Sequence, residues 1–398
     1  MPRMNARASP SGTDCRPPRA RCAVRVRFAL ELAYLDAPGY GAAMRSPSAE
    51  PYFMRAASLD DLPELLRLAE HLDSVNLPHD EAVLGRIVEK SRASFAAEIP
   101  LPEDRQYMFV LQGADSGRVA GTSTVFAQHG RPDTPHVFFD VVSDERYSST
   151  LGRLFSHTTL RLGFSYSGPT EIGALVLDPA LRSSGLGRVL SMARFLFIAM
   201  HRDLFKDEVI AELMPPLLPD GRSELWEYIG KRFTGLSYQE ADRLSHENKE
   251  FIYALFPQTP LYASMLPSSV AELIGQVGEA TRGAERILRK IGFEYSGQID
   301  PFDGGPHFSA KTDAITLVAH ARTATVLSAA DAGHPPPGAR IERCLVGNAD
   351  VSTELGALLT ADEVWVQATG VSLFPETMRA LSLEPGAQVW VSPLEAPT

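Results

Sequence analysis

The 398-residue chain has the composition of an ordinary soluble globular protein, with 44% hydrophobic and 22% charged residues. Its formal net charge of −11 argues against a nucleic-acid-binding surface and is compatible with a cationic small substrate. No apolar run approaches the ~20 residues that cross a bilayer. Three cysteines are too few for a disulfide framework. We therefore expect a cytoplasmic protein that binds small molecules and neither nucleic acid nor membrane.

The first 51 residues differ from the rest of the chain, because they are rich in Arg, Pro, Ser and Gly and poor in acids. An organelle transit peptide has a similar composition. The simpler interpretations are a disordered extension, or an initiation site placed too early, with Met44 or Met54 as the true start. We expect residues 1–51 to lie outside the fold.

The globular pattern begins at Tyr52 with a short strand. A helix should follow, with Ser58 as its N-cap and apolar residues at helical spacing through residue 69. Residues 106–127 predict a β-hairpin, because two strand-like runs flank Asp115-Ser116-Gly117.

The next segments predict alternating strands and helices. They are a strand at 170–177, a helix at 187–205, a strand at Glu208–Met214, and a helix closed by Gly292 with a strand after it. This order predicts an α/β (α+β) fold, with one mixed sheet and flanking helices, over residues 52–312. The stretch from about 203 to 280 should be an insertion that covers an acceptor pocket. Residues 313–398 should form a small β-rich C-terminal unit behind the Pro/Gly-rich segment 331–340.

The link between the strand at 170–177 and the next helix contains Arg182, Gly185, Gly187 and Arg188. Glycines at a helix N-terminus expose backbone N–H groups, and the helix dipole favours an anion there. The spacing R-x-x-G-x-G differs from the Rossmann fingerprint, and there is no Walker lysine. The segment therefore predicts a phosphate site, with a ligand-free strand–helix turn as the alternative. The scattered histidines and cysteines show no metal-binding spacing, so we expect no metal.

Three stretches in this order resemble the GNAT superfamily of acyl-CoA N-acyltransferases. They are the early "MRAASLDDLPELLRLA", the strand–(L-D-P)–R-x-x-G-x-G–helix segment, and the late "AERILRKIGFEY". In that superfamily the glycine-containing turn binds the pyrophosphate of coenzyme A. The resemblance implies an acyl-CoA cosubstrate and no prosthetic group.

A closer resemblance, from about residue 52 to 394, is to the arginine N-succinyltransferase family. It rests on "IGKRF", "LYASMLPSSVAELIGQV", "LRKIGFEYSGQIDPFDGGP" and "CLVGN". Membership implies transfer of a succinyl group from succinyl-CoA to L-arginine, in arginine catabolism. The alternatives are a divergent member with another acyl-CoA and amine pair, or a CoA-binding partner subunit with little activity. A homo-oligomer and a hetero-oligomer with a paralogue are both compatible with the sequence.

The candidate site residues form two groups, one for coenzyme A and one for the acceptor amine. The pantetheine and the oxyanion should lie along Leu175, Val176 and Leu177, and the pyrophosphate on Arg182, Gly185, Leu186, Gly187 and Arg188. Glu212, on the following strand, is the candidate general base for the acceptor amine, or else a structural carboxylate in an ion pair. Asp300 and Asp303 could bind a guanidinium group, or could hold the turn before Gly304-Gly305.

The chain departs from the family pattern at several polar positions. Gly278 and Thr259 stand where the family has histidines, and Met214 stands where it has an arginine. Leu288 replaces the tyrosine common in the superfamily's late helix. A thiolate leaves without a proton more readily than an alkoxide does, so these losses do not exclude acyl transfer.

Overall fold

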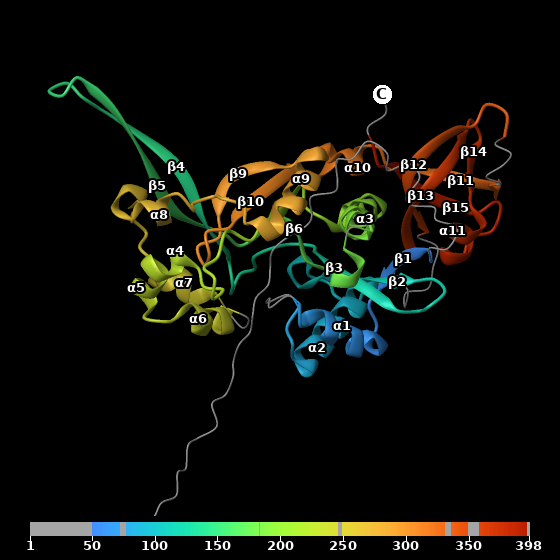
Figure 1. Ribbon diagram of the computed structural model, residues 1–398, viewed down its shortest axis with the longest axis horizontal. Coiled ribbons are helices and arrows are strands. Elements are labelled where there is room, and N and C mark those ends of the chain that lie inside the picture. The colour runs from blue at the N-terminus through green and yellow to red at the C-terminus, as the bar shows by residue number, and fades with distance from the viewer. Residues whose placement is uncertain are drawn as a thin grey trace, which may run out of the picture.

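The computed structural model describes residues 50–71, 77–182, 184–245, 249–330, 336–348 and 358–395, without the side chain of Asp242. Fifteen strands form one continuous sheet in this part of the chain (Figure 1). No helix within these residues combines the length and apolar character of a membrane span. The proposed N-terminal extension, apart from Glu50 and Pro51, lies outside the described residues.

The centre of the sheet has the strand order β1-β2-β3-β6-β7-β10-β9. These strands are β1 (Tyr52–Ala56), β2 (Gln106–Gly113), β3 (Val119–Phe126), β6 (Thr170–Leu177), β7 (Glu208–Glu212), β9 (Glu294–Ile299) and β10 (Pro306–Lys311). Only the β6–β7 pairing is parallel among these neighbours. The predicted mixed α/β sheet is confirmed.

Helices cover both faces of this central sheet. On one face, α1 (Leu62–Ala69) and α2 (Glu81–Phe95) pack on Met108 and Val110 of β2. On the other, α3 (Leu186–Met200) and α9 (Arg282–Lys290) belong to the main core with Tyr107 and Phe109. Because side chains alternate along a strand, β2 supplies both cores.

The predicted elements in this region are confirmed, with different ends in two places. The helix predicted at 187–205 ends at Met200, because His201 leaves the helical conformation and a 3₁₀ turn, Arg202–Leu204, follows. The strand predicted to reach Met214 ends at Glu212. Glu212 is therefore the last residue of β7.

The longest hairpin was not among the predicted elements. Strands β4 (His136–Ser148) and β5 (Arg153–Ser165) pair along their whole length and protrude from the body as an arm (Figure 1). Only the base of the arm pairs with other strands, with β9 and with β8 (Leu261–Tyr262). The outer part is exposed on both faces, so it lacks the alternating polarity that predicts a strand.

Short helices between β7 and β9 pack against the base of the arm around the buried Trp226. They are α4 (Glu224–Tyr228), α5 (Gly230–Thr234), α6 (Tyr238–Ser245), α7 (Glu250–Leu255) and α8 (Ser268–Ala271). This group lies beside the base of the arm and beside β9 and β10, near the point where β9 ends and β10 begins (Figure 1). That location is compatible with the proposed role as a cover for an acceptor pocket.

The C-terminal strands form a closed five-stranded barrel with its own core. They are β11 (Arg322–Ala329), β12 (Arg340–Asn348), β13 (Leu358–Gln367), β14 (Gly370–Leu373) and β15 (Gln388–Pro393), with α10 (Thr316–Ala319) before them and α11 (Pro375–Ala380) between the last two. Strand β12 pairs with both β13 and β15, which closes the ring. The barrel joins the central sheet through Met54 and Leu359 of β1 and β13. The exact division at residues 312 and 313 remains a prediction.

Truncation of the N-terminus should separate the two candidate initiators. The Glu50 carboxylate accepts hydrogen bonds from the Asp115 and Ser116 amides, and β1 begins at Tyr52. A chain that starts at Met44 should therefore keep the melting temperature of the full chain, whereas one that starts at Met54 should melt at lower temperature. Calorimetry measures both. Equal melting temperatures for all three chains would mean that Glu50 and the first half of β1 contribute nothing to stability.

Candidate active site

The glycine-containing turn leads from the end of β6 into α3. Gly185 is the N-cap of α3 and has φ of +83°, a left-handed conformation that favours glycine. At Gly187, a Cβ atom would meet only Leu177 Cδ2, at 3.7 Å. Among the described residues, the helix N-terminus therefore has room for a ligand at Gly187, as an anion site requires.

Asp178 anchors the start of this turn. Its carboxylate accepts from the Ala180 amide and lies 2.8 Å from Arg67 and 2.9 Å from Arg118. The Asp178 pKa is held below its usual value, because these hydrogen bonds and charges outweigh the effect of burial. An ionised Asp178 thus fixes the path of the chain into the turn.

The two arginines of the turn have different surroundings. Arg182 is exposed at the turn itself. Arg188 is partly buried, and its guanidinium lies 3.5 Å from the carbonyl oxygen of Leu394 and 3.4 Å from Met192 Sδ. Arg182 is therefore the better placed of the predicted pair to meet a phosphate from solvent.

Strand β6 is irregular where the thioester is predicted to lie. Its pairing with β3 shifts between Gly173 and Val176, so that Ala174 and Leu175 lie opposite Ser123 alone. Ala174 has φ of +48° at this bulge. A bulge takes one residue out of the ladder, which frees backbone groups for a ligand.

Strands β6 and β7 also diverge toward the same end. Their parallel pairing consists of Thr170 with Val209 and Glu171 with Ile210, and it stops there. Beyond this point the two strands no longer pair with each other, and they carry Leu175, Val176 and Leu177 on β6 and Glu212 on β7. The structure thus places the predicted thioester strand and the predicted base on two neighbouring, diverging strands.

Glu212 lies between two histidines. Its Oε1 atom is 3.6 Å from His136 Nε2 and 3.5 Å from His307 Nε2. The Glu212 side chain is 22% exposed, whereas His136 and His307 are 4% and 0% exposed. The carboxylate is therefore the accessible member of this group, which we call the His–Glu–His group.

A third histidine and a second carboxylate extend the cluster. His129 Nδ1 lies 2.8 Å from Glu171 Oε2, and the His129 and His136 rings stack with centroids 4.1 Å apart. Burial lowers the pKa of His129, but the Glu171 charge outweighs burial and raises it. Burial, and then the charge of His129, lower the pKa of His136 to about 4. Glu171 thus favours the cationic form of His129, whereas His136 is neutral near neutral pH.

The same cluster has metal-ligating side chains, which the sequence did not predict to meet. The donor atoms of His129, His136 and Glu212 lie within 4.8 Å of one another. However, the first two rings stack at an interplanar angle of 26°. An ion bound to an imidazole nitrogen lies close to the plane of the ring, so the stacked rings would have to turn before one ion could bind both. The group therefore suits proton binding better than ion binding.

Asp300 and Asp303 lie close to this cluster but also hold their own turn. Asp300 Oδ1 accepts from the Phe302 amide at 2.6 Å, and Asp303 Oδ1 accepts from the Gly305 amide at 2.7 Å. Lys249 Nζ is 3.6 Å from Asp300 Oδ2. Burial, and then the charge of Asp300, raise the pKa of Asp303 well above its usual value. These surroundings thus favour the protonated form of Asp303.

The three departures from the family pattern do not provide polar groups here. A Cβ atom at Gly278 would lie 2.5 Å from the carbonyl oxygen of Pro215, so this position has no room for a side chain. The Met214 carbonyl accepts from the Gly278 amide, and Thr259 is exposed on a loop. The histidines around Glu212 come from other positions, which no local motif marks.

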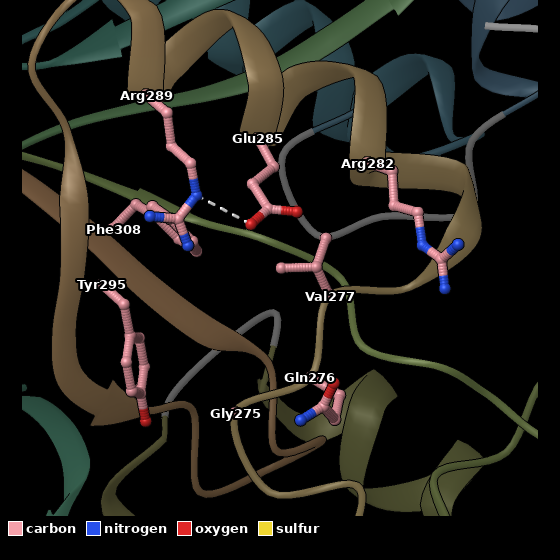
Figure 2. A pocket seen from close by; sticks show the side chains of 8 residues that line it. All are labelled: Gly275, Gln276, Val277, Arg282, Glu285, Arg289, Tyr295 and Phe308. Carbon is pink, nitrogen blue, oxygen red and sulfur yellow. Dashed lines mark hydrogen bonds and ion pairs between the residues drawn. The ribbon is translucent and has the colours of Figure 1, made fainter. Parts of the chain in front are cut away.

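A cavity of about 310 Å³ lies beside α9, on the other face of the sheet from Glu212. Figure 2 shows Arg289 of this helix beside Phe308 and paired with Glu285, with Arg282 at the opposite side of the cavity from Tyr295. Strand β10 shows on which face of the sheet the cavity lies. His307 pairs with Glu212 and shares its face, whereas the next residue, Phe308, points to the opposite face and lines the cavity. Arg289 is paired with Glu285 at 2.9 Å. This cavity is therefore separate from the His–Glu–His group.

Comparisons with known proteins agree with this geometry. The family model described as "Arginine N-succinyltransferase beta subunit" matches residues 52–317. "Arginine N-succinyltransferase" of Salmonella arizonae is 33% identical over 305 residues, 76% of this chain and 87% of that protein. The enzyme of the same name from Escherichia coli is 34% identical over 298 residues, 74% of this chain and 85% of the relative.

A solved structure extends the likeness to three dimensions. Subunit AI of the Pseudomonas aeruginosa arginine/ornithine succinyltransferase aligns with 87% of this chain and 100% of its own, with a TM-score of 0.74 and 28% identity. The match therefore extends well beyond the central sheet. The chain belongs to the arginine N-succinyltransferase family of acyltransferases.

Proposed function

We propose that this protein transfers the succinyl group of succinyl-CoA to the amino group of L-arginine. The observation that supports the proposal is that β6, which leads into the glycine-containing turn, and β7, which ends at Glu212, are parallel neighbours that stop pairing before their ends, in a chain of this family. The pyrophosphate would bind at the N-terminus of α3, with Gly185, Leu186, Gly187 and exposed Arg182 around it and Arg188 behind them. The thioester carbonyl would lie at the β6 bulge.

The acidic cluster supports a cationic acceptor. Glu212 and Asp300 are carboxylates that face the buried Lys249, and the Asp300 charge is the main cause that raises the Lys249 pKa. Asp300 in particular could accept hydrogen bonds from a guanidinium group in competition with Lys249. Asp303 would then contribute through the turn that holds Asp300 in position.

Release of the coenzyme A thiol tests the proposal. We expect rapid release with succinyl-CoA and L-arginine, and slower release with acetyl-CoA or with ornithine, lysine or agmatine as acceptor. Release that is fastest with another pair would identify a divergent family member. Succinyl-CoA binding without release, with any acceptor in the panel, would instead support a CoA-binding subunit. Gly278 has no room for the side chain that the family's histidine would need, and this observation favours the CoA-binding subunit.

We also propose that the protein acts as an oligomer, either with itself or with a paralogue. The tip of the β4–β5 arm exposes apolar side chains that a solvated hairpin would not need, namely Tyr147, Leu151, Leu154 and Phe155. Sedimentation of the purified chain should give a mass above that of one copy, if the partner is itself.

A cytoplasmic location remains part of the proposal, and the buried free thiol of Cys344 is compatible with it.

A further inference from the structure

We propose that the proton lost by the acceptor ammonium passes through Glu212 to His307. His136 also lies beside the Glu212 carboxylate, and as a neutral ring it adds no charge there. This inference rests on the proposed acyl transfer and names the acid–base group for it. Neither histidine belongs to a motif in the sequence. Both become interpretable only when the strands are assembled.

The geometry brings His307 and Glu212 together by strand pairing. They are directly opposite residues of β10 and β7, so their side chains lie on the same face of the sheet. His136 begins β4, and its ring lies 5.5 Å from that of His307. Three separate strands therefore place two imidazoles beside one carboxylate oxygen.

The ring nitrogens of both histidines lack partners among the described residues. His136 and His307 each have two buried nitrogens without a hydrogen bond. The separations of 3.5 and 3.6 Å from Glu212 Oε1 are longer than hydrogen bonds. An unpaired buried polar group destabilises the folded protein, so its presence calls for a reason such as catalysis. A small closing movement would let a proton pass from Glu212 to His307.

The surrounding charges explain why Glu212 needs a second acceptor. Burial raises the Glu212 pKa, but a positive charge on His307, the contact with His136 and the charges of Lys249 and His129 outweigh burial and lower it well below its usual value. A proton held on the His307 ring therefore stabilises the ionised Glu212 carboxylate beside it. Asp303 and Asp300 also face the cluster, from the β9–β10 turn. A carboxylate with so low a pKa attracts an ammonium group but holds its proton only briefly.

The proposed step balances as follows. The ammonium N–H bond breaks, its proton passes to the Glu212 carboxylate and on to a ring nitrogen of His307, and the freed electron pair of the amine attacks the thioester carbon. When the tetrahedral intermediate collapses, the C–S bond breaks and its electron pair leaves on sulfur. The amine nitrogen, now bonded to the acyl carbon, gives its second proton to that thiolate. His307 then returns the first proton to solvent.

The variant His307→Gln tests this inference, with His201→Gln as a control. His201 is a partly buried histidine at the end of α3, away from Glu212. With succinyl-CoA and L-arginine near neutral pH, we expect His307→Gln to lower kcat by about 100-fold. The KM for succinyl-CoA should change less than about twofold, since the contacts of the coenzyme are untouched. The loss should shrink at alkaline pH, where more of the amine is already neutral.

His307 is fully buried, so a second variant guards against misfolding. His307→Ala leaves space for free imidazole, which should restore activity in proportion to its concentration. Full activity in His307→Gln, a loss independent of pH, or no recovery of a folded His307→Ala with imidazole would each overturn the role of His307 while the transfer activity stands. A wild-type protein that fails to succinylate arginine would overturn the proposed function as well.

Discussion

Replacement of Glu212 with glutamine is expected to lower the kcat of arginine succinylation by about 100-fold or more near neutral pH. Glutamine keeps the size of the side chain and one hydrogen-bonding oxygen, but it cannot accept the proton of the acceptor ammonium. The affinity for succinyl-CoA should hardly change, because the glycine-containing turn that would bind the pyrophosphate lies at the end of β6. Steady-state kinetics from neutral to alkaline pH measure both effects.

Glu208→Gln is the matched control for this variant. Glu208 begins the same strand and pairs with exposed Lys311 at 2.9 Å, away from the histidines. It should retain wild-type kinetics. If Glu212→Gln keeps full activity, Glu212 is structural and water serves as the base. If it binds succinyl-CoA poorly, the coenzyme lies closer to β7 than we propose.

Replacement of Gly187 with valine should weaken the binding of coenzyme A by at least about tenfold. The new side chain would fill space next to the helix N-terminus, where the pyrophosphate should approach the backbone, and the attraction of the helix dipole would be reduced with distance. The fold should persist, because a Cβ atom at Gly187 meets only Leu177 at ordinary van der Waals distance. Calorimetric titration with CoA measures the affinity.

Gly85→Val provides the control, since Gly85 is also a helical glycine with room for a Cβ atom. It should bind CoA as the wild type does. Gly185 is less suitable for a single test, because its φ of +83° makes any other residue cost about 1–2 kcal/mol of stability. Unchanged CoA affinity in a folded Gly187→Val protein would mean that the turn does not bind the coenzyme.

The sequence predicted the elements whose signals are local. The strand, turn and helix around Gly185 follow from an apolar run, glycines and helical periodicity within a short stretch, and the structure has them in place. The hairpin at Asp115-Ser116-Gly117 also follows from adjacent residues. The β4–β5 arm was missed, because exposure of both faces removes the alternating pattern that marks a half-buried strand.

The surroundings of Glu212 could not be predicted in the same way. Glu212 itself was placed correctly on its strand, which ends there and not at Met214, but His129, His136 and His307 come from distant parts of the chain. A single sequence contains no signal that pairs residues of β4, β7 and β10. The sequence also left two roles open for Asp300 and Asp303, a guanidinium site and a turn. In the structure both side chains accept hydrogen bonds from their own turn.

Mass spectrometry of the products tests the central claim most directly. The purified wild-type protein is incubated with succinyl-CoA and L-arginine, and the reaction is analysed for arginine that carries one succinyl group on its amino nitrogen. We predict N-succinylarginine and free coenzyme A in equal amounts, with neither formed when either substrate is left out. Free coenzyme A without succinylated arginine, or no reaction in a folded protein that binds succinyl-CoA, would contradict the account.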